Sequence, residues 1–177
     1  GAGERVLFRL ETHPHATAFV LLVQSLAQPD WSWLHEPAAQ GYLLPTLLLP
    51  AGICANLQSK PFDLELSRGQ TLAFRLRANP TVKRTVNGEK KRCGLYQEEE
   101  QRAWLARKAE QGGFDLLGAR TSREEMLEGH LHRNGNRHAL QFLAVQFDGV
   151  LQVRDPARLR TTVKSGIGSA KGFGFGL

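Results

Sequence analysis

The first sixty residues predict a pair of strands followed by an irregular segment. Val, Leu and Phe are concentrated in two runs, residues 5–10 and 18–26, with His13-Pro14-His15 between them. Two such runs on either side of a turn are typical of a β-hairpin. Five prolines then interrupt the pattern up to residue 61, and they leave room for one short helix at residues 31–36.

The pattern changes between residues 60 and 70, where Ser67-Arg68-Gly69-Gln70 predicts a turn into a second unit. We place the domain boundary at residue 63, so the expected units are 1–62 and 63–177. Through residues 71–77 apolar side chains alternate with Arg75 and Arg77, which predicts a half-buried strand that ends at Asn79-Pro80. Good helix formers at residues 98–111, followed by Gly112-Gly113, predict a helix.

Two dipeptides predict turns in the last third of the chain. Asn134-Gly135 is the strongest short hairpin signal, and Asp148-Gly149 predicts a second turn before a strand at residues 150–153. Asp155-Pro156 predicts the start of a short helix that Gly166 ends, and apolar side chains at alternate positions of residues 173–177 predict a last strand. The order strand, helix, two strands, helix, strand is typical of a ferredoxin-like βαββαβ domain, so the expected fold class is α+β.

The charge is distributed unevenly between the two expected units. The formal net charge is +6; residues 1–62 carry three Lys/Arg and four Asp/Glu, or −1, and residues 63–177 carry twenty against thirteen, or +7. Clusters of this kind favour polyanions, of which RNA is the candidate here, although a basic surface that only keeps the protein in solution is an equal alternative. The densest cluster predicts these RNA-binding residues: Arg75, Arg77, Lys83, Arg84, Lys90, Lys91 and Arg92.

The predicted hairpin around Asn134-Gly135 is a second candidate RNA-binding element. It carries Arg133 and Arg137 at its tip, and a two-stranded ribbon fits a groove of a duplex. His130 and His132 stand two apart on one strand and could together hold a metal ion, but no cysteine or acidic residue lies nearby at ligand spacing. We therefore expect no metal site, and an exposed polar hairpin without a ligand remains the alternative.

A glycine-rich segment at residues 166–176 is the third candidate. Glycines let backbone N–H groups approach a phosphate and a lysine adds a positive charge, which makes Gly166, Gly168, Lys171 and Gly172 candidate RNA-binding residues. Residues 171–175 also match the opening of the RNP1 pattern, in which aromatic rings stack on bases. A loop that needs glycines only for packing is the alternative. The spacing does not match a nucleotide-cofactor fingerprint, and no cofactor is expected.

The sequence argues against a membrane partner and a disulfide framework. The longest apolar run, residues 42–55, is interrupted by Pro45, Pro50 and Gly52, so it falls short of a membrane span. Only two cysteines are present, which favours a reducing cytoplasm.

Several segments together resemble the CasE endoribonucleases of type I-E CRISPR systems. The resemblance is carried, in order and spacing, by residues 22–25, 29–31, 74–81, 91–93, 101–108 and 166–172. It implies two ferredoxin-like (RRM-like) domains in tandem that bind a CRISPR repeat stem-loop. It further implies cleavage at the 3′ base of the stem without a metal ion, by attack of the 2′-hydroxyl on the adjacent phosphorus. The enzyme is then expected to stay on the mature guide RNA, beside the other subunits of the type I-E effector complex.

The resemblance leaves the catalytic residue unassigned. In the family the catalytic histidine lies on the first helix of the first domain, whereas this chain begins at what resembles the second strand. We therefore expect the first domain to lack its opening strand and helix, and the catalytic histidine to lie upstream of Gly1. None of the six histidines matches it. The alternative function is a non-catalytic RNA-binding subunit of a ribonucleoprotein.

Overall fold

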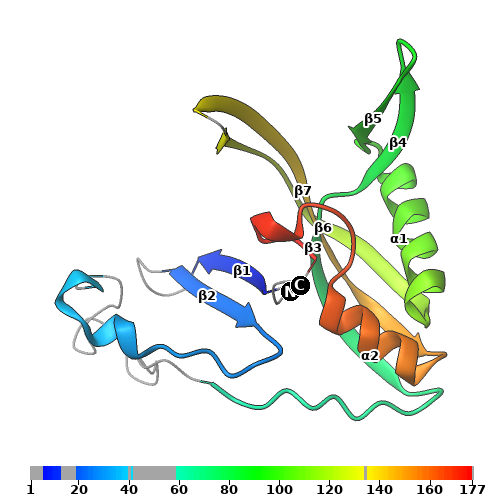
Figure 1. Ribbon diagram of the computed structural model, residues 1–177. Helices are drawn as coiled ribbons and strands as arrows, with labels where there is room; N and C mark the ends of the chain where they lie inside the picture. Colours follow the sequence, from blue (N-terminus) through cyan, green and yellow to red (C-terminus); the bar gives the residue numbers. More distant parts are fainter. Residues whose placement is uncertain (1–5, 13–18, 40, 42–58, 134, 177) are drawn as a thin grey trace.

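The computed structural model describes residues 6–12, 19–39, 41, 59–133 and 135–176. Its largest sheet has three antiparallel strands in the order β3-β7-β6: β3 is Thr71–Ala78, β6 is Phe114–Arg133 and β7 is Asn136–Val153. Two helices, α1 (Glu98–Gly112) and α2 (Pro156–Ser165), pack on one face of this sheet (Figure 1). The chain order β3, α1, β6, β7, α2 is that of the predicted ferredoxin-like domain.

The core lies between the two helices and the sheet. Trp104 and Leu105 of α1 pack against Leu76, Val145 and Phe147 of the strands. Leu159 of α2 is buried in a second cluster. It packs there with Leu151 and Val153 of β7 and with Ala109 near the end of α1. The predicted alternation in β3 is therefore confirmed: Leu76 points into the core, and Arg75 is exposed on the other face.

The helix ends follow the predicted signals. Gly113 ends α1 in the left-handed conformation at φ 82°, which glycine adopts without strain. At the start of α2 the side chain of Asp155 accepts a hydrogen bond from the Arg158 N–H at 3.0 Å, and Pro156 occupies the first turn. No helix in the described part of the chain is long and apolar enough to cross a membrane.

The predicted N-terminal hairpin is present. β1 (Leu7–Thr12) pairs antiparallel with β2 (Phe19–Gln24), and short 3₁₀ helices follow at η1 (Ser32–His35) and η2 (Pro37–Ala39). The hairpin contacts α2 through Gln24, whose side-chain amide donates to the carbonyl of Val163 at 3.0 Å. The predicted turn at His13-Pro14-His15 and the apolar run 42–55 lie outside the described residues.

One hairpin was not predicted from the sequence. β4 (Thr81–Val86) and β5 (Glu89–Gly94) form a separate two-stranded sheet inserted between β3 and α1. Asn87 and Gly88 connect them with φ angles of 52° and 80°, as the type I′ hairpin turn requires. This Asn-Gly pair is the same hairpin signal as Asn134-Gly135, so the turn is recognisable in the sequence.

The prediction of two hairpins in tandem was wrong. Asp148 and Gly149 lie in the middle of β7, which pairs with β6 as one long hairpin. β6 has a bulge between Leu116 and Gly118 beside this position, and a Cβ on residue 149 would clash with the carbonyl oxygen of Gly118 and lie 2.8 Å from the ring of Phe74. Glycine at this position therefore serves a close backbone approach and not a turn.

The prediction of a last strand at residues 173–177 was also wrong for the described residues. Lys171–Phe173 form a 3₁₀ helix, η4, and Gly174 and Gly176 have left-handed φ angles of 84° and 90°. Positive φ values interrupt the extended backbone that alternation alone predicts. The segment nevertheless lies beside β3, since the Gly176 N–H donates to the carbonyl of Arg77 at 2.7 Å.

Candidate functional site

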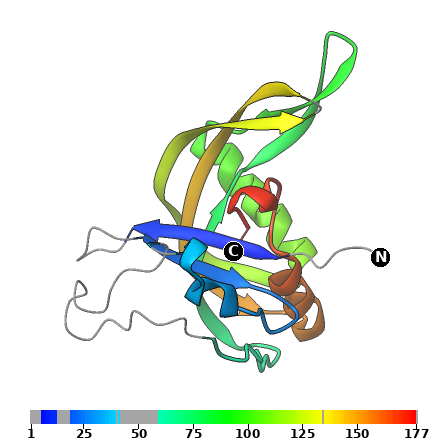
Figure 2. The ribbon, with the colours of Figure 1, turned by 60° about the vertical axis from the view of Figure 1, so that its left-hand side comes forward.

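The β6–β7 hairpin projects beyond the three-stranded sheet (Figures 1 and 2). Its pairing continues to His132 opposite Arg137 and Arg133 opposite Asn136, so the predicted hairpin is present. Antiparallel pairing thus holds the tip as a two-stranded ribbon, the shape that fits a nucleic-acid groove. The side chain of Arg133 is outside the described residues, so its role in RNA binding stays a prediction.

His130, one of the two histidines considered as metal ligands, has an arginine as its partner. The Arg137 guanidinium lies 3.0 Å from Nε2 of His130, and because arginine can only donate, Nε2 is the acceptor. A cation at this nitrogen occupies the position that a metal ion would need. Among the residues that the structure describes, no three His, Cys, Asp or Glu side chains form a potential metal site.

The β4–β5 ribbon gathers most of the basic cluster, and its register sorts the cations onto two faces. Lys83 lies opposite Arg92 and Thr85 lies opposite Lys90 on one side, which we call the Lys83 face. The other side, the Arg84 face, carries these opposed pairs: Val82 and Cys93, Arg84 and Lys91, Val86 and Glu89.

The cations of the Arg84 face have acidic partners. A nitrogen of Arg84 lies 2.8 Å from a carboxylate oxygen of Glu100 on α1, and Nζ of Lys91 lies 3.2 Å from Glu89. The structure shows no ion pair for the cations of the Lys83 face within the described ranges. In the sequence all these residues form one cluster, because the face of each depends on the register of a hairpin that was not predicted.

The two arginines of β3 both have carboxylate partners. Arg75 Nε donates to Asp148 at 2.6 Å, and this hydrogen bond, with a weaker one from Ser122, holds the pKa of Asp148 below its usual value. Arg77 is half-buried and pairs with Glu125 of β6. Their contact with RNA stays a prediction. Arg75 joins β3 to the neighbouring strand β7, and Arg77 joins β3 to β6 on the far side of β7.

The glycine-rich segment makes many contacts within the protein. Lys171 Nζ donates to the carbonyl of Ser165 at the end of α2, at 2.7 Å. A Cβ on Gly166 would lie 3.0 Å from Leu7, and one on Gly168 would lie 3.0 Å from the Trp104 ring. Gly172 has open space around it. These contacts favour the packing alternative for Gly166 and Gly168, while a phosphate contact by Gly172 or Lys171 stays a prediction.

The RNP1 alternative does not fit the arrangement of the aromatic rings. RNP1 rings stand on a strand and face bases, whereas here Phe173 lies in a 3₁₀ helix. The rings of Phe173 and Phe175 lie 4.8 Å and 5.7 Å from the ring of Phe142, centroid to centroid. Phe175 is buried, so its ring contributes to packing.

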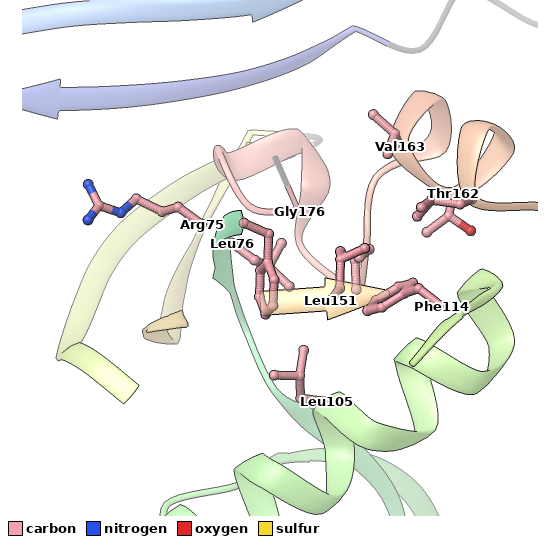
Figure 3. A pocket seen from close by; sticks show the side chains of 11 residues that line it. Arg75, Leu76, Leu105, Phe114, Leu151, Thr162, Val163 and Gly176 are labelled. Carbon is pink, nitrogen blue, oxygen red and sulfur yellow. The ribbon is translucent and has the colours of Figure 1, made fainter. Parts of the chain in front are cut away.

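A cavity of about 130 Å³ lies where α1, α2 and the sheet meet (Figure 3). Apolar side chains such as Leu105, Phe114, Leu151 and Val163 make up most of its lining. Figure 3 shows the guanidinium of Arg75 pointing away from it. Because the cavity offers so few polar groups, it does not suit a phosphate, and the hairpins remain the candidate interface.

Comparison with known proteins identifies the family. A family model described as "CRISPR associated protein" matches residues 1–177. The CRISPR-associated endoribonuclease Cse3 of Thermus thermophilus is 38% identical over 182 residues, which cover 98% of this chain and 78% of the relative. The chain belongs to the CasE-type family of CRISPR-associated proteins.

A second relative and a solved structure support the same family assignment for this CasE-type chain. The CRISPR system Cascade subunit CasE of Escherichia coli is 33% identical over 158 residues, which cover 81% of this chain and 75% of the relative. The solved structure of CRISPR endoribonuclease Cse3 bound to 19 nt RNA has a TM-score of 0.75 and 36% identity, covering 98% of this chain and 78% of that one. The α+β fold of tandem ferredoxin-like domains, predicted from the sequence, is thereby confirmed.

Proposed function

We propose that this protein is the endoribonuclease that processes CRISPR transcripts and then stays on the guide RNA as a subunit of the type I-E effector complex. The main support for this proposal is the match of nearly the whole chain to a Cse3 structure with bound RNA. The two projecting hairpins add exposed cations of the kind that bind a phosphate backbone. The substrate is the stem-loop of the CRISPR repeat.

The reaction proposed is an internal transesterification at the 3′ base of the stem. The 2′-hydroxyl oxygen bonds to the adjacent phosphorus, the bond from phosphorus to the 5′-oxygen of the next nucleotide breaks, and that oxygen takes up a proton. The products are a 2′,3′-cyclic phosphate and a 5′-hydroxyl. Because the nucleophile belongs to the RNA itself, a general base, a general acid and cations near the phosphorane suffice, and we propose that no metal ion takes part.

We further propose that none of the histidines whose side chains the structure describes is the catalytic base. His130 accepts from Arg137, and His138 and His35 are exposed on a strand and in a 3₁₀ helix. Alanine at any of these three positions should leave the rate of cleavage within about twofold of the parent. A loss of 10²-fold or more at one of them, the effect typical of a general base, would contradict the assignment.

The deciding experiment incubates repeat RNA with the protein in excess EDTA and identifies the product ends by mass spectrometry. We expect one cut per RNA, a cyclic phosphate on the upstream product and slow release of the stem-loop. Cleavage that requires an added divalent cation would overturn the metal-free reaction. Tight binding without cleavage by the protein from its native source would instead support the non-catalytic RNA-binding subunit.

The contribution of the β6–β7 tip is tested by the double variant Arg133→Ala with Arg137→Ala. Each charge-assisted contact to a phosphate or a base edge is expected to contribute about 1–3 kcal/mol to binding. Circular dichroism shows whether the variant is folded. Unchanged affinity for the stem-loop in a folded double variant would mean that the tip does not bind RNA.

A further inference from the structure

The two faces of the β4–β5 ribbon differ in charge. The Lys83 face carries three cations and a threonine, for a formal charge of +3: Lys83, Lys90, Arg92 and Thr85. The Arg84 face carries Arg84 and Lys91, and the carboxylates of Glu89 and Glu100 pair with them, for a formal charge of zero. The basic cluster is therefore a one-sided surface.

This one-sided arrangement opposes the folding of the ribbon itself. Lys83 and Arg92 stand directly opposite each other, and like charges at opposed positions destabilise an antiparallel pair. The ribbon also forms a sheet of its own two strands, and such a hairpin is only marginally stable alone. A bound polyanion would remove the repulsion between the two cations.

We propose that the Lys83 face binds the phosphate backbone of the RNA, in addition to the contacts of the β6–β7 hairpin, and that the Arg84 face does not. This inference rests on the proposed function, because it takes the polyanion to be RNA. All four side chains of the Lys83 face are exposed, and the ribbon projects from the same end of the domain as β6–β7 (Figures 1 and 2).

The chemistry of the face suits backbone contact. Lysine binds phosphate as a point charge, and the planar guanidinium of Arg92 can donate two parallel hydrogen bonds to one phosphate. The Asn87-Gly88 turn sets the register, and this register places Lys83, Lys90 and Arg92 on one face of the ribbon. Contacts of this kind position the RNA and carry no sequence information of their own.

The test compares two double variants. Each removes two positive charges from the ribbon, but from opposite faces. Lys83→Gln with Arg92→Gln removes the opposed pair of the Lys83 face. Arg84→Gln with Lys91→Gln removes the opposed pair of the Arg84 face and is the matched control. Binding is measured by fluorescence anisotropy at several salt concentrations, with a repeat stem-loop RNA that carries a 2′-deoxy nucleotide at the 3′ base of the stem to prevent cleavage.

We expect the Lys83-face variant to lower the slope of log affinity against log salt by about 1.4–1.8, since each phosphate contact contributes about 0.7–0.9. At 0.1 M salt, taken as a round reference, this corresponds to affinity weaker by roughly 25- to 60-fold. Its thermal midpoint should stay the same or rise, because a repulsion is removed. The Arg84-face variant should bind RNA within about threefold of the parent, the effect of net charge alone.

Two outcomes would overturn the inference. Equal losses in the two variants would show that only the net charge of the ribbon is important, and an unchanged slope in the Lys83-face variant would show that this face does not contact RNA. In both cases a parent protein that binds and cleaves repeat RNA leaves the proposed function intact. A parent that neither binds nor cleaves the stem-loop would overturn the proposed function and this inference with it.

Discussion

Replacement of Arg77 by alanine should reduce the stability of the protein, whether or not this residue also contacts RNA. Arg77 lies on β3, and its guanidinium pairs with Glu125 of β6 and lies 3.5 Å from the carbonyl oxygen of Leu10 on β1. Its own backbone carbonyl accepts from Gly176. One residue therefore contacts three segments that are far apart in the sequence.

The expected loss follows from the burial of the ion pair. The side chains of Arg77 and Glu125 are 22% and 28% exposed, so solvent screens their interaction only in part. A charge-assisted bond in this setting contributes about 1.5–3 kcal/mol, and we expect the free energy of unfolding to fall by about 2 kcal/mol. For a chain of this size that corresponds to a decrease of about 4–8 °C in the thermal midpoint.

The matched control is Arg75→Ala. Arg75 lies two residues away on the same strand and also pairs with a carboxylate, but its side chain is 57% exposed, so solvent screens this pair and we expect a smaller loss than in Arg77→Ala. Urea unfolding of both variants measures the difference. Hydrogen exchange should in addition show faster exchange in β1 of the Arg77 variant. An Arg77→Ala variant that keeps its unfolding free energy and loses RNA affinity would refute this reasoning.

Two further predictions concern pH and packing. The pKa of Asp148 is lowered mainly by its hydrogen bond from Arg75, so the stability this provides is complete above its usual pKa of 3.8 and is lost as the pH falls through the lower value of the folded state. Urea titrations from pH 6 downward should therefore show a shallower acid loss in Asp148→Asn than in the parent, and parallel curves would contradict the pairing. Gly149→Ala should destabilise the fold by about 1–3 kcal/mol because the new Cβ meets the Phe74 ring and the facing backbone. Gly129→Ala in the same hairpin, where a Cβ has open space, is its control, and equal midpoints in thermal melts would argue against the close approach.

Local signals in the sequence were enough to predict most of the individual elements. Three signals act through neighbours a few residues away: the alternation of apolar residues and arginine in β3, the Asp155-Pro156 start of α2, and the glycines at the end of α1. Their conformational preferences therefore hold in almost any fold. The order of these elements was sufficient for the ferredoxin-like α+β class, and family resemblance, not composition, connected it with CRISPR RNA.

Tertiary contacts decided the features that local patterns predicted wrongly. Asp148-Gly149 has the composition of a turn, yet β6 and β3 lie on either side of it and hold it in an extended strand. The alternating Phe173 and Phe175 resemble a strand, yet the rings pack on Phe142 and the intervening glycine takes a left-handed φ. In both places hydrogen bonds and packing with distant residues outweigh a local preference of about 1 kcal/mol.

In the candidate site, too, the sequence determines some features and the tertiary structure decides others. The sequence shows that the basic residues are close together along the chain, and this predicts a polyanion partner. It does not show that Arg84 faces Glu100 while Lys83 faces solvent, because adjacent residues of a strand point to opposite sides and the partner of each depends on where the ribbon lies. The number of cations is a property of the sequence, whereas the number left without a carboxylate partner depends on strand register and on the position of α1.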